Sequence, residues 1–106
     1  MLPDALYART LTWDDAQALS GESFELIADE AHPVGTPMTI ASVDLRSAGD
    51  PLQFSIVFRG PPEPVLEQKT YRLRHARLGE YAIFITPIAH NPTATEYEAC
   101  FTWRAG

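Results

Sequence analysis

The chain has 106 residues, of which 45% are hydrophobic and 10% aromatic, and its net charge is −6. This length suits one core, so we expect residues 1–106 to form a single globular domain, and the composition excludes an intrinsically disordered chain. The acidic balance argues against a nucleic-acid partner, because lysine and arginine supply most of the affinity for phosphates.

The first predicted element is a short helix within "LTWDDAQALSGESF". Thr12 is suited to cap its N-terminus, and Asp14 and Asp15 fall in the first turn, where the helix dipole favours anions. Gly21 is suited to end the helix. The apolar stripe of this segment is short, so we expect the helix to need packing against a sheet.

After the helix, the hydrophobic period changes to two, which is typical of β-strands. Strands are predicted over residues 23–28, 37–47, 52–59, 68–75, 80–88 and 95–103. Short strands separated by turn signals indicate an antiparallel all-β fold. The predicted fold class is therefore mainly β, with about six antiparallel strands in a small barrel or sandwich and one short N-terminal helix.

Two of these strands carry more specific expectations. The apolar phase slips between Ile40 and Val43, which predicts a β-bulge or a bend. Strand 80–88 is apolar on both phases, as expected of a central strand that is covered on both faces. Pro87 should mark the end of that strand or a bulge in it.

The segment "RHARLGEY" predicts a hairpin. A type I turn centred on Arg77 and Leu78 would place Gly79 in the left-handed region, where glycine is favoured. The cross-strand pairs that follow from this three-residue loop are His75–Tyr81, Leu73–Ile83 and Tyr71–Ile85. A four-residue loop, which sets His75 opposite Glu80, matches apolar side chains less well.

The sequence shows no catalytic or metal-binding constellation. It contains neither of the glycine-rich phosphate-binding motifs nor the G-x-S-x-G nucleophile elbow. His32, His75 and His90 have no second ligand at metal-binding spacing. Cys100 is the single cysteine and has only an acid as a neighbour, so we expect an inert, half-buried thiol. We therefore expect no catalytic residue, no metal and no other cofactor.

The chain also shows no membrane or secretion signal. No run of 18 apolar residues is present, and the first ten residues lack the pattern of a secretory signal. We expect a cytoplasmic protein that does not contact a membrane and is a monomer or a weak homodimer.

The stretch "RGPPEP" joins two predicted strands. Pro61 and Pro64 satisfy the P-x-x-P spacing of ligands for aromatic grooves. A rigid crossover is favoured over a ligand, because proline fixes φ and such ligands normally lie in flexible tails. Arg59 is hypothesised to pin this loop by binding its carbonyls or an acid of the N-terminal half, and the rival hypothesis is contact with an anionic partner.

Residues 54–88 resemble the signature of a small, uncharacterised bacterial domain family. Its members share an F-S-x-x-F-R-G-P block, then P-V-L-x-Q-x-T-Y, a histidine and L-G hairpin, and an apolar strand that ends in proline. "LSGESFEL" and "YEACF" extend the resemblance over nearly the whole chain, whereas Glu67 and Lys69 replace a proline and a glycine of the pattern. The resemblance implies no assigned activity. It implies an accessory role beside proteins that resemble phage tail-collar or tail-fibre components.

Two functional hypotheses remain open. The favoured one is a non-catalytic protein-interaction or structural accessory module, with a contact patch at Trp103 or around the proline loop. The alternative is a small-ligand-binding β-barrel or weak enzyme with a mouth near Tyr71, His75 and Tyr81, although six strands leave little interior volume. Basic residues 69–77 are interpreted as the solvated face of a strand. The candidate interaction residues are Arg59, Tyr71, Arg72, Arg74, His75, Tyr81 and Trp103.

Overall fold

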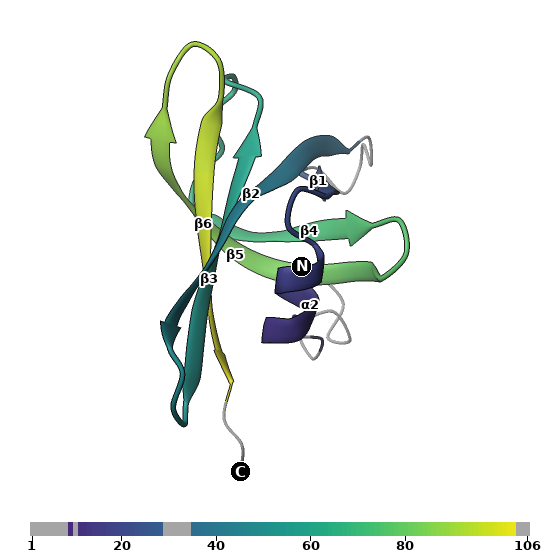
Figure 1. The fold of residues 1–106 in the computed structure, drawn as a ribbon. Helices are drawn as coiled ribbons and strands as arrows, with labels where there is room; N and C mark the ends of the chain where they lie inside the picture. Colours follow the sequence, from purple (N-terminus) through teal and green to yellow (C-terminus); the bar gives the residue numbers. More distant parts are fainter. Residues whose placement is uncertain (1–8, 10, 29–34, 104–106) are drawn as a thin grey trace.

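The computed structural model describes residue 9 and residues 11–28 and 35–103 (Figure 1). Within these residues the chain forms one helix and six strands. The helix is α2 (Trp13–Ala18), and the strands are β1 (Ser23–Ile27), β2 (Thr36–Ser47), β3 (Leu52–Gly60), β4 (Lys69–His75), β5 (Gly79–His90) and β6 (Thr95–Trp103). The predicted fold class is confirmed, and every strand end lies within two residues of its expected position. No helix among the described residues is long and apolar enough to cross a membrane.

Helix α2 begins as the sequence predicts, but it ends at Ala18 with Leu19 as its C-cap, before the predicted stop at Gly21. Oγ1 of Thr12 accepts a hydrogen bond from the backbone N–H of Asp15 at 3.0 Å, which makes Thr12 the N-cap. Gly21 follows the helix with a φ of 84°, and its N–H donates to the carbonyl of Ile40. Ala16 is fully buried, so this six-residue helix is held by packing against the sheet.

The six strands close into an antiparallel ring in the order β1-β2-β3-β6-β5-β4. The ring is not evenly round, because β2 and β5 each change partner along their length. β2 pairs with β1 over residues 36–39 and with β3 over residues 39–47. β5 pairs with β4 over residues 79–85 and with β6 over residues 86–90. Below that point, β6 continues beside β3 while β5 and β4 run away to one side (Figure 1).

Two bulges lie near these changes of partner. The pairing of β2 with β3 shifts its register between Ile40 and Ser42, which confirms the bulge predicted from the phase slip. The pairing of β5 with β6 shifts between Pro87 and Ala89. Pro87 therefore marks a bulge, and β5 continues beyond it to His90.

The inner faces of the strands and one end of the helix form a single core. Phe24 and Phe58 meet edge to face across the ring, with their centroids 5.9 Å apart. Leu11, Ala16 and Leu19 join the same cluster from the helical segment. The largest fully buried side chains include Phe24, Leu26, Met38, Ile40, Phe54, Ile56, Phe58, Leu73, Ile85 and Tyr97. The interior of the ring is thus filled by the protein's own side chains, as in other small barrels.

The prediction that the fifth strand is covered on both faces is wrong. The inner side chains of Tyr81, Ile83 and Ile85 are at most 4% exposed, but Phe84 on the outer face of β5 is 51% exposed. Helix α2 packs against the inner cluster and leaves this outer face uncovered. No second layer among the described residues therefore covers the apolar residues on the outer face of β5.

The predicted register of the β4–β5 hairpin is wrong by two residues. The observed pairs are His75–Gly79, Leu73–Tyr81 and Tyr71–Ile83. The cause is a side-chain contact: Nδ1 of His75 accepts hydrogen bonds from the backbone N–H groups of Arg77 and Leu78, so the turn begins one residue earlier than expected. A shift of two residues keeps each side chain on its predicted face. Gly79 has the predicted positive φ, at 85°.

The positive φ of Gly79 predicts a stability loss for Gly79→Val. A side chain in the left-handed region should lower the free energy of unfolding by about 1–2 kcal/mol. Gly49→Val is the matched control, because a Cβ at Gly49 meets no atom within 4 Å and its φ is not in that region. Urea denaturation of both variants measures the difference. Equal losses in the two variants would contradict the hairpin geometry.

Candidate functional site

The candidate residues of the sheet lie on two opposite faces. Tyr71, His75 and Tyr81 point into the core, and each is 4% exposed. Arg72 and Arg74 alternate with them along β4 and lie on the outer face. The structure therefore brings the two tyrosines and the histidine to one face and leaves the arginines out of it.

The two tyrosines make contacts that hold the fold. The hydroxyl of Tyr71 donates to the carbonyl of Glu67 at 2.8 Å, and burial, followed by the charge of Glu67, raises the pKa of Tyr71. The guanidinium of Arg9 lies 4.2 Å from the ring centroid of Tyr81 and donates to its hydroxyl and to the carbonyl of Glu80. These contacts tie loops to β4 and β5.

His75 is the centre of a charged cluster with Glu22 and Arg77. Its Nδ1 accepts from backbone N–H groups, so its Nε2 carries the proton and donates to the Glu22 carboxylate at 2.8 Å. Arg77 donates to both oxygens of the same carboxylate, at 2.8 and 3.0 Å. The hydrogen bond from His75 and then that from Arg77 lower the pKa of Glu22. This cluster clamps the segment before β1 onto the β4–β5 turn.

The arginines of the outer face are neutralised by acids on neighbouring strands. Arg74 lies 3.4 Å from Glu25 on β1 and 3.9 Å from Glu80 on β5. Arg72 lies 3.8 Å from the same Glu80. Each of these ion pairs is partly exposed, so each adds little to the free energy of unfolding. The arrangement agrees with the interpretation of this basic run as a solvated strand face.

The hypothesis that Arg59 pins the proline loop is wrong. Arg59 pairs with Glu96, its cross-strand neighbour on β6, at 2.8 Å, and its side chain is mostly exposed. The loop is held by β6 and the end of β5 instead. Oγ1 of Thr95 and Nε2 of His90 both donate to the carbonyl of Pro62, at 3.0 and 2.9 Å.

A tyrosine hydroxyl completes the attachment of the loop. The N–H of Leu66 donates to the hydroxyl of Tyr97 at 2.9 Å, and Tyr97 is itself buried. Thr95 is fully buried at the start of β6, which is an unusual place for a polar residue. In the sequence, Thr95 shares the apolar phase of Tyr97 and Ala99, and a polar residue on that phase, after a loop rich in acceptors without donors, is the signal that could have identified these anchors.

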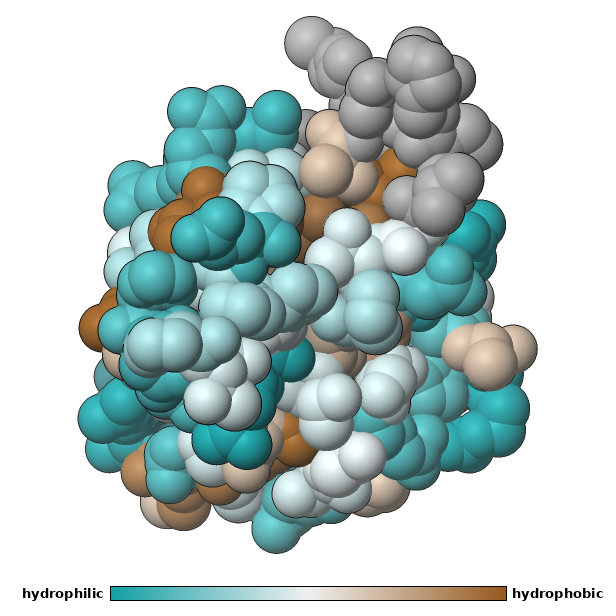
Figure 2. Space-filling view, turned by 90° about the horizontal axis from the view of Figure 1, so that it is seen from above, coloured by the Kyte–Doolittle hydropathy of each residue, from teal (hydrophilic) through white to brown (hydrophobic). Residues whose placement is uncertain are grey.

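The upper end of the ring is closed by this loop. A hollow of about 100 Å³ remains between the loop and the strands, lined by Ala28, Thr36, Met38, Pro61, Glu63, Pro64, Leu66 and Tyr97. Seen from above, the described surface is mostly hydrophilic, with separate apolar spots (Figure 2). Among the described residues, the hollow at this end is small, and the apolar groups seen from above lie apart from one another.

The lower end of the ring is open and apolar. Trp103 is 49% exposed although it follows the inner phase of β6, and it pairs with Leu52 on β3. Leu45 lies on the same inner face and is 45% exposed. The ring of Trp13 packs 5.4 Å from Phe54, which connects this end to the core. We call Trp13, Leu45, Leu52 and Trp103 the Trp103 surface.

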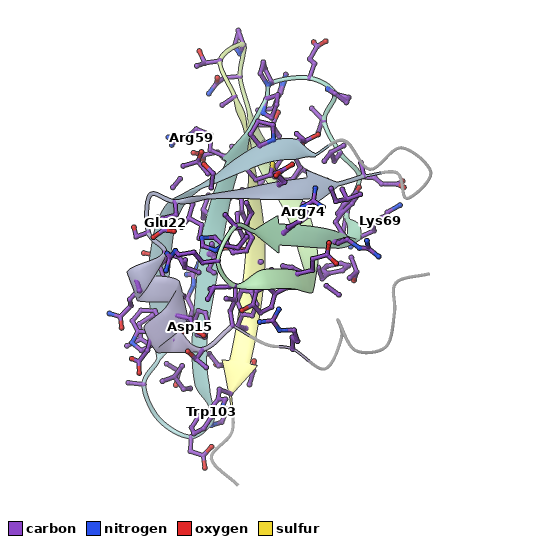
Figure 3. All side chains as sticks on the ribbon, turned by 90° about the vertical axis from the view of Figure 1, so that its right-hand side faces the viewer. Asp15, Glu22, Arg59, Lys69, Arg74 and Trp103 are labelled. Carbon is purple, nitrogen blue, oxygen red and sulfur yellow. The ribbon has the colours of Figure 1, made fainter. Side chains whose placement is uncertain are left out.

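The Trp103 surface contains a hollow of about 320 Å³. Its walls are Thr12, Trp13, Asp14, Leu52 and Trp103. Figure 3 shows Trp103 at the bottom of the molecule below Asp15, with Arg74 and Lys69 higher up. Of these wall residues, the sequence predicts only Trp103 as a candidate, because Leu52 joins it through the β3–β6 pairing and Thr12, Trp13 and Asp14 through the packing of α2.

The histidines and the cysteine of the described residues are dispersed. No cluster of three or more histidines, cysteines or acids that could hold a metal ion occurs among them, and His32 lies outside them. The expectation that Cys100 is half-buried is wrong, because its side chain is exposed on the outer face. Partial desolvation and then Glu98 raise the pKa of Cys100, so the thiol stays protonated at neutral pH.

Metal removal should leave the stability of the domain unchanged. Thermal unfolding with and without a chelator measures this directly, because a structural metal contributes to folding free energy. Coincident midpoints are expected. A midpoint that drops by several degrees with the chelator would reveal a site that uses other residues.

The charged cluster predicts a pH dependence that Glu22→Gln removes. A lowered pKa means that Glu22 contributes stability above its unfolded value of about 4.3, and that this contribution is lost as the pH falls through the folded value. Urea unfolding should therefore show a gap between wild type and Glu22→Gln at neutral pH that narrows in acid. Glu25→Gln is the control, because Glu25 makes a single, partly exposed ion pair among the described residues, with Arg74. A gap independent of pH would contradict the assignment.

Comparison with known proteins places this architecture in a family. No curated protein and no solved structure matches the chain. One family model matches residues 11–101, which includes the helix, all six strands except the last two residues of β6, the proline loop and most of the Trp103 surface. The chain therefore belongs to the family described as a domain of unknown function, DUF6916.

Proposed function

We propose that the domain is a non-catalytic protein-interaction module and that its contact surface is the Trp103 surface. The half-exposed ring of Trp103 carries this proposal. Tryptophan is among the residues that contribute most binding energy at protein interfaces, and it gains that energy when a partner covers it. Trp103 also lies on a paired strand, so little conformational entropy is lost on binding.

The rest of the lower end suits the same role. Leu52 extends the apolar area beside Trp103, Trp13 forms another wall of the hollow, and Leu45 is a further exposed apolar side chain on the same face of the sheet. Acids lie around this apolar centre, with Asp14 in the wall and Asp15 next to it. An apolar centre with a polar rim is the usual composition of a protein interface.

The alternative of a ligand-binding barrel or weak enzyme gains no support from the interior. Tyr71, His75 and Tyr81 are buried and already bonded to neighbouring segments of the chain. Their polar atoms are occupied by contacts that hold loops in place. The observations therefore favour a surface that binds a protein over a mouth that binds a small molecule.

The wider biological setting is part of this proposal. The resemblance of residues 54–88 to a bacterial signature supports a cytoplasmic accessory role in a phage-tail-like assembly. The partner would then be a protein component of that assembly, and the free domain would be a monomer or a weak homodimer. The identity of the partner tests this setting.

Trp103→Ala should abolish partner capture. Truncation of a central tryptophan costs about 2 kcal/mol or more, which lowers affinity by about 30-fold. Phe84→Ala is the matched control, since Phe84 is an aromatic residue of similar exposure on the outer face of β5. Both variants should first show wild-type melting.

The measurement is affinity capture with the three proteins as baits, followed by identification of what each retains. Proteins kept by wild type and Phe84→Ala and lost by Trp103→Ala are the expected result. If the captured proteins are lost by Phe84→Ala but kept by Trp103→Ala, the interface lies on the outer face of β5 and the proposal is wrong.

A further inference from the structure

We propose that the hollow of the Trp103 surface binds an arginine side chain of the protein partner. This inference rests on the proposed function and specifies the chemistry of the partner. It is carried by the composition of the hollow, whose walls are two tryptophans, one leucine, one threonine and one aspartate.

The walls of the hollow favour a cation with a flat, weakly hydrated surface. Trp13 and Trp103 line it from two different elements, the helix and β6, and Leu52 of β3, the cross-strand partner of Trp103, lines it too. The face of an indole ring attracts cations more strongly than the face of any other aromatic side chain. A volume of about 320 Å³ accommodates a guanidinium group with its methylene stem.

Asp14 supplies the countercharge. None of the ion pairs among the described residues engages Asp14 or Asp15. Glu22, Glu25, Glu80, Glu96 and Glu98 are among the acids that do have a basic partner there. Asp14 thus leaves its carboxylate for a group from outside the described part of the chain.

The helix dipole does not cancel this charge. The N-terminus of a helix carries a partial positive charge of about half a unit at most, and α2 has only six residues. Asp14 and Asp15 each carry a full negative charge, and Thr12 already accepts the N–H of Asp15. The electrostatic potential at the hollow is therefore negative.

The same carboxylate disfavours an apolar occupant. A leucine or phenylalanine side chain that filled the hollow would remove water from Asp14 without giving it a hydrogen bond, and that desolvation is unfavourable. Lysine could neutralise the charge, but its ammonium group is strongly hydrated. Arginine can stack on an indole ring while it donates two N–H groups to a carboxylate, so it fits both features.

The test is a titration of the full chain, labelled with nitrogen-15, followed through the two indole N–H signals. The probes are N-acetyl-arginine amide and N-acetyl-citrulline amide, which have nearly the same shape but differ in charge. N-acetyl-norleucine amide is the apolar probe. Arginine amide should shift both indole signals saturably, and citrulline amide should bind about tenfold more weakly.

Two isosteric variants sharpen the result. Asp14→Asn should lower the affinity for arginine amide by about tenfold and leave the affinity for citrulline amide unchanged. Asp15→Asn is the matched control, because it removes the same charge one residue away from the wall. The affinity of Asp15→Asn for arginine amide should stay within about threefold of the wild-type value.

Equal affinity for arginine and citrulline amides, or tighter binding of norleucine amide, would overturn the inference. So would indole signals that none of the three probes moves. These outcomes are separate from the proposed function, which the capture experiment with Trp103→Ala decides. A partner lost by Trp103→Ala but kept by Asp14→Asn would leave the interface in place and reject the arginine.

Discussion

The change of partner along β5 is the constraint on which the rest of the structure depends. Over its first half β5 pairs with β4, and only from Thr86 onward does it pair with β6. The inner row of β6 is therefore enclosed as far as Ala99 but continues to Trp103 beyond the closed part of the ring. Helix α2 covers part of that extension through Trp13 and leaves the hollow beside it. One strand thus contributes both to a sealed core and to an exposed aromatic surface.

The two ends of the ring differ for the same reason. At the upper end β5 and β6 are paired, and the buried polar residues Thr95 and Tyr97 hold the proline loop over the core. The prolines supply carbonyls without matching donors, and β6 and His90 supply the donors. The loop is therefore a structural closure of the fold. The lower end has no equivalent closure among the described residues, which leaves Trp103 available for a partner.

The alternation of apolar residues was enough to predict the strands and the β2 bulge, because burial on one face fixes which residues point inward. The helix cap followed from the residue types of Thr12, Asp14 and Asp15. Apolar alternation could not predict the hairpin register, because a shift of two residues leaves each side chain on the same face. The register is set by the hydrogen bonds that Nδ1 of His75 accepts from the turn. Trp103 could be identified as an exposed aromatic candidate. Trp13 and Asp14 could not, because only the packing of α2 below the ring brings them beside it. Arg59 was misassigned because its cross-strand partner, Glu96, depends on the β3–β6 pairing.

The central claim is that the free domain presents Trp103 to solvent at the open end of the ring. The most direct measurement is acrylamide quenching of Trp13→Phe, in which Trp103 is the one remaining tryptophan. The structure predicts that acrylamide quenches its emission strongly, with a spectrum typical of a partly hydrated indole. Weak quenching and the blue-shifted emission of a buried ring would contradict the claim, because the lower end would then be covered in the free protein.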